Sequence, residues 1–407
     1  MLKTLPLILI TIFTVTLMPV KAQTIKNYTA QWKKVDGFIE KKLPKSALAE
    51  VKNIYALAKK ENQDAQVIKS LVYLTGLQNE LREDNEVISI KELEKELLSS
   101  KEPASSIINS ILAEKYFNYF QQMRWRLYER TQTVSFKKDD IATWGAEDFH
   151  KKISELYLKS ISNDKILKQT SLKSFDAIII QGNTRSLRPT LFDLLAHRAI
   201  DNFRNDERDI KKPAYAFEIN QPEAFAPAAE FVKAKFSTRD SFSLQHKALL
   251  IYQELIIFHL NDSKPDALID VNIARLEYVK EKSVLNNKDE LFENALEAIT
   301  KKYGDLPAAA QAWYLLASSY NEKANEYKPY GDSTHRMDKL IAKQICERVL
   351  KQKDTTEGLI NCINLLKEIN KKELKFSLEK INVPGLPFRS LTTRRCGPAM
   401  STSWLLI

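Results

Sequence analysis

The stretch that decides the fold is Trp313-Tyr314-Leu315-Leu316-Ala317-Ser318-Ser319-Tyr320. Its largest and smallest apolar side chains recur at intervals of three and four, which places them on one face of an α-helix. Bulky residues on such a face wedge between neighbouring helices, and a small one allows a close approach. The predicted repeat-packing positions are Trp313, Leu316, Ala317 and Tyr320.

The surrounding sequence indicates a stacked helical repeat with a period of ~34 residues. The spacing W-x2-L-A-x2-Y is that of the first helix of a tetratricopeptide repeat, with Ala317 where glycine is usual. Upstream, Ala295 and Pro307 stand where the second-helix alanine and the terminal proline of the preceding unit belong. Trp313 then follows in register, so two adjacent units agree.

Two further segments continue this pattern. After an insertion at residues 326–338 the second-helix spacing resumes, and another helix begins near Thr355. The positions that resume it are Ala342, Cys346 and Val349. A weaker copy near the N-terminus consists of Trp32, Val35, Ile39, a turn at Leu43-Pro44, Ala47, Val51 and Ile54.

Apolar spacing of three and four dominates from Gln31 to Asn370, so we predict an all-α fold of the tetratricopeptide-like repeat or solenoid type. Residues 23–130 form an N-terminal helical repeat region, and residues 241–372 form the tetratricopeptide-like repeats. Between them, residues 131–240 fit no repeat. Several prolines there predict short helices joined by long connections.

The pattern changes after Lys372. Residues 374–381 alternate apolar and polar side chains and lead into Val383-Pro384-Gly385-Leu386-Pro387, which predicts a strand followed by a turn. Residues 373–407 are too few for a sandwich domain of ~100 residues, and one strand leaves its edges unpaired. We interpret them as the truncated start of a β domain and an aberrant tail.

Residues 1–22 have the pattern of a cleavable signal peptide, with Lys3, an apolar run from Leu5 to Met18, and cleavage between Ala22 and Gln23. The run is shorter than the roughly 20 residues of a spanning helix. We therefore expect export and no transmembrane segment after cleavage; an uncleaved anchor is the alternative. Basic and acidic residues alternate despite a formal net charge of +10, so no nucleic-acid partner is expected.

The three cysteines include a candidate disulfide between Cys346 and Cys362. In the repeat register, Cys346 lies on the inward face of one second helix and Cys362 on the next first helix. These surfaces pack together, so the Cα atoms could meet the ~7 Å limit for a bridge. Two buried free thiols are an equally favoured interpretation.

Asp193, His197 and Asp201 follow one another at intervals of four, which places them on one helical face. A histidine between carboxylates could hold a metal or act as a tuned general base. The sequence offers neither a third ligand nor an open pocket, so this is a weak candidate site. A surface or half-buried histidine with salt-bridged neighbours is favoured instead.

No other motif indicates catalysis, and we expect no catalytic residue, no cofactor and no metal. No two of the nine glycines are close enough for a phosphate-binding loop, and G-x-S-x-G and H-E-x-x-H are absent. The segment at 123–128 mixes aromatic and basic residues, as membrane-surface or nucleic-acid segments do. Helical spacing instead predicts that its aromatic residues lie in the core and its arginines in solvent.

Several ordered segments resemble the N-terminal helical region of large bacterial α2-macroglobulin-like proteins. They are QWKKVD at 31–36, LRPTLFDLLAHRA at 187–199, NCINLL at 361–366 and LPFR at 386–389, and the resemblance covers residues 25–391. It implies a periplasmic or cell-surface protein of a Gram-negative bacterium that traps proteases. In that family a bait segment is cut, macroglobulin-like sandwich domains rearrange, and in many members a Cys-Gly-Glu-Gln thioester captures the protease.

The sequence departs from that family at Thr392. Cys396-Gly397-Pro398-Ala399 is not the thioester motif, no bait region can be assigned, and the alternating pattern is lost before Ile407. We hypothesise a frameshift or premature stop near Leu391. Reading the coding DNA beyond the stop tests this, since the absence of sandwich sequence in every frame there rejects it.

The leading hypothesis is that the chain is a non-catalytic scaffold or partner-binding region of an exported α2-macroglobulin-like endopeptidase inhibitor, inactive as an inhibitor in this truncated form. Its partner would be a protein, such as a protease in the full-length form. The alternative is a free-standing exported repeat adaptor for protein–protein interaction. A hydrolase that uses His197 has the least support.

Overall fold

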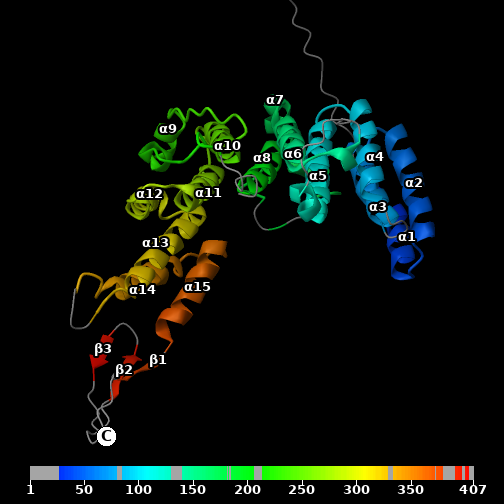
Figure 1. The fold of residues 1–407 in the computed structure, drawn as a ribbon. Coiled ribbons are helices and arrows are strands. Elements are labelled where there is room, and N and C mark those ends of the chain that lie inside the picture. Colours follow the sequence, from blue (N-terminus) through cyan, green and yellow to red (C-terminus); the bar gives the residue numbers. More distant parts are fainter. Residues whose placement is uncertain are drawn as a thin grey trace, which may run out of the picture. The chain divides into compact units, whose positions relative to one another are not determined.

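The structure, a computed structural model, describes residues 27–79, 85–129, 140–180, 182, 185–205, 213–328, 333–371, 373–378, 390–396 and 399–402. These residues are mostly helical (Figure 1), so the predicted all-α class is confirmed for the body of the chain. The chain divides into two compact units, Met1–Asn85 and Glu86–Ile407. The predicted signal peptide, with its cleavage between Ala22 and Gln23, lies outside the described residues.

The described residues of the first unit form three helices, each of which packs against the next. They are α1 (Thr29–Glu40), α2 (Pro44–Lys60) and α3 (Asp64–Asn79). Lys42 and Asn62 have φ values of 55° and 52°, so the left-handed residues that end α1 and α2 are not glycines. In each case the backbone N–H of this residue and that of the next residue donate back to the last turn, which closes a Schellman motif and reverses the chain.

Trp32 is central to the core of this unit. Its indole N–H donates to the amide oxygen of Gln66 on α3 at 2.7 Å, and Val35 is fully buried beside it on α1. The expectation that Ile39 belongs to the same packing face is wrong, because 42% of Ile39 is exposed in the last turn of α1.

The second unit contains the remaining helices and the strands. Its α-helices are α4 (Asn85–Ser99), α5 (Ala104–Glu129), α6 (Ala146–Ile161), α7 (Asp164–Gln169), α8 (Leu191–Phe203), α9 (Ala228–Phe231), α10 (Leu244–His259), α11 (Asp266–Lys282), α12 (Lys288–Tyr303), α13 (Ala310–Lys323), α14 (Asp338–Val349) and α15 (Glu357–Asn370). Short 3-10 helices are η1 (Ile141–Thr143), η2 (Leu172–Phe175), η4 (Pro222–Phe225) and η5 (Pro307–Ala309).

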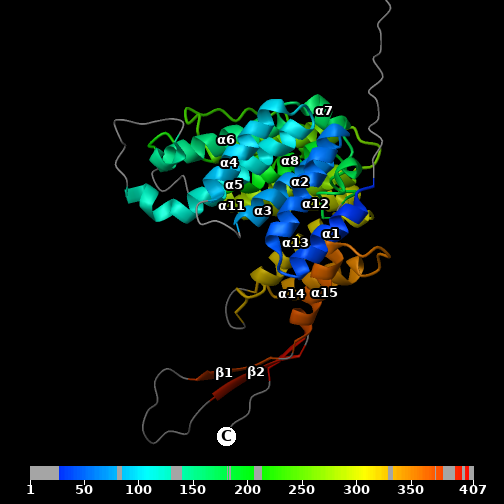
Figure 2. The same ribbon diagram turned by 90° about the vertical axis from the view of Figure 1, so that its right-hand side faces the viewer.

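Helices α13, α14 and α15 share one apolar core, and α14 and α15 lie side by side in both views (Figures 1 and 2). Small residues allow the close approach: Ala310, Ala317 and Ala342 are fully buried there. Gly358 of α15 lies even closer to the α13 backbone, since a Cβ atom built on it would clash with the carbonyl carbon of Ala310. The α13–α15 contact therefore requires glycine at this position.

The C-terminal residues that the structure describes form a three-stranded antiparallel sheet in the order β1-β2-β3. The strands are β1 (Glu373–Leu378), β2 (Ser390–Cys396) and β3 (Ala399–Thr402). Glu373 pairs with Arg395 and Leu378 with Ser390. Whether this segment begins a macroglobulin-like sandwich remains a prediction.

Candidate functional site

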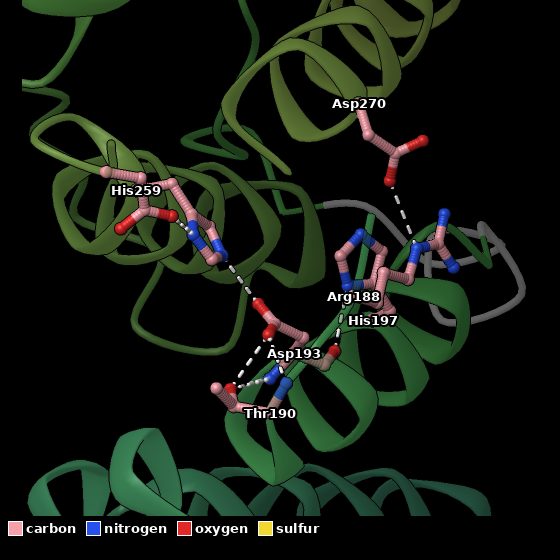
Figure 3. A network of polar contacts seen from close by, with 7 residues as sticks. Arg188, Thr190, Asp193, His197, His259 and Asp270 are labelled. Atoms are coloured by element: carbon pink, nitrogen blue, oxygen red, sulfur yellow. Dashed lines mark hydrogen bonds and ion pairs between the residues drawn. The ribbon is translucent and has the colours of Figure 1, made fainter. Parts of the chain in front are cut away.

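The N-terminus of α8 is the starting point of a buried polar network (Figure 3). Thr190 is the N-cap, and its hydroxyl accepts a hydrogen bond from the backbone N–H of Asp193. The Asp193 carboxylate accepts in return from the backbone N–H of Thr190 at 2.8 Å and from its hydroxyl at 2.7 Å. This reciprocal capping box holds the Asp193 side chain in one orientation at the positive end of the helix.

The other Asp193 oxygen contacts His259, the last residue of α10, at 2.7 Å from Nε2. The second ring nitrogen of His259, Nδ1, lies 2.7 Å from a carboxylate oxygen of Asp262. The His259 and Asp193 side chains are only 2% and 1% exposed. Because carboxylates only accept hydrogen bonds, both short contacts form together only when each ring nitrogen carries a proton.

The pKa of His259 agrees with a charged ring. Burial by itself lowers this pKa, but the hydrogen bonds and negative charges of Asp193 and Asp262 outweigh burial and raise it above the ordinary value. The C-terminal end of α10 also favours a cation, since helix carbonyls point towards it. The two carboxylates therefore favour the imidazolium form of His259, and the ring joins the end of α10 to the start of α8.

His197 lies one turn further along α8 and differs from His259. Its Nδ1 lies 2.8 Å from the backbone carbonyl oxygen of Asp193, and its Nε2 is buried with no partner among the residues that the structure describes. Burial first, and the positive charge of Arg188 second, lower the pKa of His197. Arg188 itself pairs with Asp270 on α11, with 3.1 Å between Nε and the carboxylate (Figure 3).

This arrangement suits a structural role better than acid–base chemistry. A general base needs a free ring nitrogen within reach of a proton, and both nitrogens of His259 face carboxylates. His197 has a free nitrogen, but the described residues place no nucleophilic hydroxyl or thiol in hydrogen-bond contact with it. Within the described ranges, no group of three or more His, Cys, Asp or Glu side chains could hold a metal ion.

The three residues predicted from their spacing are only partly brought together. Asp193 and His197 are in contact, but through the Asp193 backbone and not through its carboxylate. Asp201 is exposed and takes no part in the network. Sequence reasoning missed His259 as the partner of Asp193; the available signals were the Thr190-x2-Asp193 capping pattern and a histidine at a helix end.

The repeat-packing residues lie where α13 meets its neighbours. Leu316 and Ala317 are buried, and Trp313 and Tyr320 pack half-buried against the α13–α14–α15 core. The Trp313 indole N–H donates to the carbonyl oxygen of Gly304 at 3.1 Å. The guanidinium of Arg348 lies over the Trp313 ring, 4.6 Å from its centroid, in a cation–π contact.

The candidate disulfide residues lie in this same core as free thiols. Cys346 on α14 and Cys362 on α15 are both fully buried. Of the two alternatives that the sequence leaves open, the structure contains the unbridged pair.

One aromatic residue contradicts its predicted place. Trp125, in the mixed aromatic and basic segment of α5, is 77% exposed, and Arg124 lies 5.5 Å from its ring centroid. Helical spacing predicts that the aromatic residues of this segment are buried; the neighbouring apolar residue Leu127 is buried, but Trp125 is not. The last turn of α5 therefore presents an indole to solvent.

A groove of about 310 Å³ lies along α11, α12 and α13. Its lining includes Lys280, Glu281, Leu315, Ser318 and Glu322.

No helix in the described part of the chain is long and apolar enough to cross a membrane. Comparisons of the sequence with family models, of the chain with curated proteins, and of the fold with solved structures give no match.

Proposed function

We propose that this chain is a non-catalytic helical scaffold that binds a protein partner through helices α10 to α15. The observation that carries this proposal is the succession of packing contacts, in which each of these helices lies against the next one along the chain. Arrays built from neighbour contacts present extended concave surfaces, which repeat proteins use to bind other proteins. The tetratricopeptide-like stretch of α13 lies within this succession.

The groove along α11, α12 and α13 is the binding place that we assign to this scaffold. Charged side chains of both signs line it, namely Lys280, Glu281 and Glu322, while Leu315 supplies apolar surface. Burial raises the pKa of Glu277 in the same lining. A groove with apolar surface and charges of both signs suits a polypeptide segment better than a single small ligand.

We further propose that the scaffold belongs to an exported α2-macroglobulin-like endopeptidase inhibitor. The support is the set of ordered sequence segments at 31–36, 187–199, 361–366 and 386–389. In this proposal the protein works in the periplasm or at the cell surface, and its helical region contacts a protein partner. The groove assignment does not depend on this family assignment.

A matched pair of charge reversals tests the scaffold proposal. Glu322→Lys reverses an exposed charge in the groove, and Glu297→Lys makes the same change at an exposed position of α12 outside its lining. Immobilised wild-type protein and both variants are used to capture exported proteins, and each enriched protein is purified for a direct measurement of Kd. We expect wild type and Glu297→Lys to bind alike and Glu322→Lys to bind at least about tenfold more weakly. The proposal fails when no protein binds directly or when both variants bind equally.

A further inference from the structure

Cys346 and Cys362 come from successive helices and meet in one apolar core. Each is fully buried, and their surroundings include Ala342, Val349 and Leu365. Neither thiol is bridged, and nothing in the proposed scaffold function uses them. A pair of nucleophilic side chains in mutual contact has a chemistry that a purely apolar core lacks.

The two thiols influence each other's ionisation, which makes them unequal. The Cys362 thiol, as the largest cause, lowers the pKa of Cys346, and the Cys346 thiol together with burial raises the pKa of Cys362. The thiolate is the nucleophile in thiol–disulfide exchange. Once the core opens, either thiolate can react first, and the other thiol lies in the same cluster, where it is placed to attack second.

We propose that Cys346 and Cys362 are a redox-modifiable pair, which a small-molecule disulfide oxidant converts into an intramolecular disulfide between α14 and α15. In one of the two orders, the Cys346 thiolate attacks one sulfur of oxidised glutathione and releases one glutathione thiolate. Cys362, after losing its proton to solvent, attacks the Cys346 sulfur of the mixed disulfide and releases the second. The two cysteine sulfurs are oxidised by two electrons, and one oxidised glutathione becomes two reduced glutathione molecules.

Oxidation requires a local opening of α15, because both thiols are buried in the closed core. Three features keep α15 closed: the Thr356 hydroxyl caps its first turn, Gly358 lies against the α13 backbone, and the Asn361 amide donates to the side-chain oxygen of Gln311 at 3.1 Å. The reaction is therefore slow in the native chain and faster in low urea. Once formed, the bond closes the loop from Cys346 to Cys362 and lowers the opening equilibrium of α15 on the order of 100-fold.

The test uses the full chain with Cys396→Ser, so that the pair contains the only cysteines left. The protein is equilibrated with glutathione buffers of increasing oxidised fraction in low urea, quenched with an alkylating reagent, and mapped as peptides. We expect a linked peptide containing Cys346 and Cys362 that disappears with reductant. In hydrogen exchange, we expect α15 amides to be on the order of 100-fold better protected in the oxidised chain.

Cys346→Ala and Cys362→Ala are matched controls, each of which should keep one alkylated cysteine and show no gain in protection. When either control variant is unstable, the presence or absence of the linked peptide in the Cys396→Ser chain is enough to test the proposal. Two results overturn the proposal: both thiols remain alkylated after equilibration with oxidised glutathione, or each carries a glutathione adduct and no linked peptide forms.

Discussion

Replacing Asp193 by alanine removes the anion that connects α8 to α10. The side chain accepts hydrogen bonds from His259 and from the Thr190 backbone and hydroxyl, and it is 1% exposed. Loss of a capping interaction costs about 1 kcal/mol. Leaving one member of a buried ion pair without its partner costs about 3–5 kcal/mol. His259 keeps its contact with Asp262, so we expect a total destabilisation of about 4 kcal/mol.

Native-state hydrogen exchange is the appropriate assay, because two compact units do not have to unfold in one step. The opening free energy is read from α8 and α10 amides in wild type, Asp193→Ala, His259→Ala and the double variant. We expect a coupling energy above about 1.5 kcal/mol between the two residues. Asp262→Ala should cost less than about 1 kcal/mol, since Asp262 is 37% exposed. A loss below about 1.5 kcal/mol for Asp193→Ala, or an additive cycle, would refute the buried ion pair.

The same cycle should depend on pH in one direction. The pKa of His259 in the folded chain is raised above its ordinary value of 6.5. The stability that its charge contributes is therefore fully present below about pH 6.5 and is lost as the pH rises through the folded pKa. The coupling energy between Asp193 and His259 should fall as the pH rises through the folded pKa of His259. The hydrogen bond from the Thr190 backbone N–H to the Asp193 carboxylate should persist. Equal coupling energies on the two sides of the folded pKa would contradict this assignment.

Three other substitutions have expected effects. Arg275→Met should lower stability by about 3 kcal/mol, because buried backbone carbonyls lose their charged donor; an unchanged thermal unfolding midpoint contradicts this. Gly358→Ala should cost about 1–3 kcal/mol, since its Cβ would clash with the backbone at Ala310, and exchange of α15 amides should accelerate. Trp32→Phe leaves the buried Gln66 oxygen without its donor and should cost about 1–3 kcal/mol. Faster exchange in α1 to α3 is the readout, and wild-type rates would exclude the Trp32 prediction.

Helix positions were predictable where one apolar face decides the structure. The stretch around Trp313 falls within α13, and the weaker N-terminal copy around Trp32 spans α1 and α2. The two misplaced side chains, Ile39 and Trp125, both lie in the last turns of helices. Apolar periodicity predicts burial equally for every turn of a helix. In the last turns of α1 and α5, however, Ile39 and Trp125 are exposed.

The polar network could not be predicted in the same way. Asp193 and His259 are 66 positions apart, and a spacing rule compares only residues on one element. The even spacing of Asp193, His197 and Asp201 was therefore a misleading signal, because the ion-pair partner of Asp193 comes from another helix. Local rules do explain half of the site, since Thr190-x2-Asp193 is a capping pattern that fixes the carboxylate whatever its distant partner is.

Part of the segment without repeat periodicity, residues 219–234, receives buried hydrogen bonds at its backbone carbonyls. Arg275 is fully buried and donates to the carbonyl oxygens of Ala224 and Ala226 at 2.6 and 3.0 Å. Gln253 donates to two carbonyls near α9, and Ser283 to that of Ile219. An irregular connection carries carbonyl groups that no helix satisfies, so a polar side chain from a neighbouring regular helix must reach them. Hydrophobic periodicity therefore identifies the helices that donate these bonds, α10 and α11, but not the loops that accept them. This explains why the middle of the sequence shows no repeat pattern although it is tightly held.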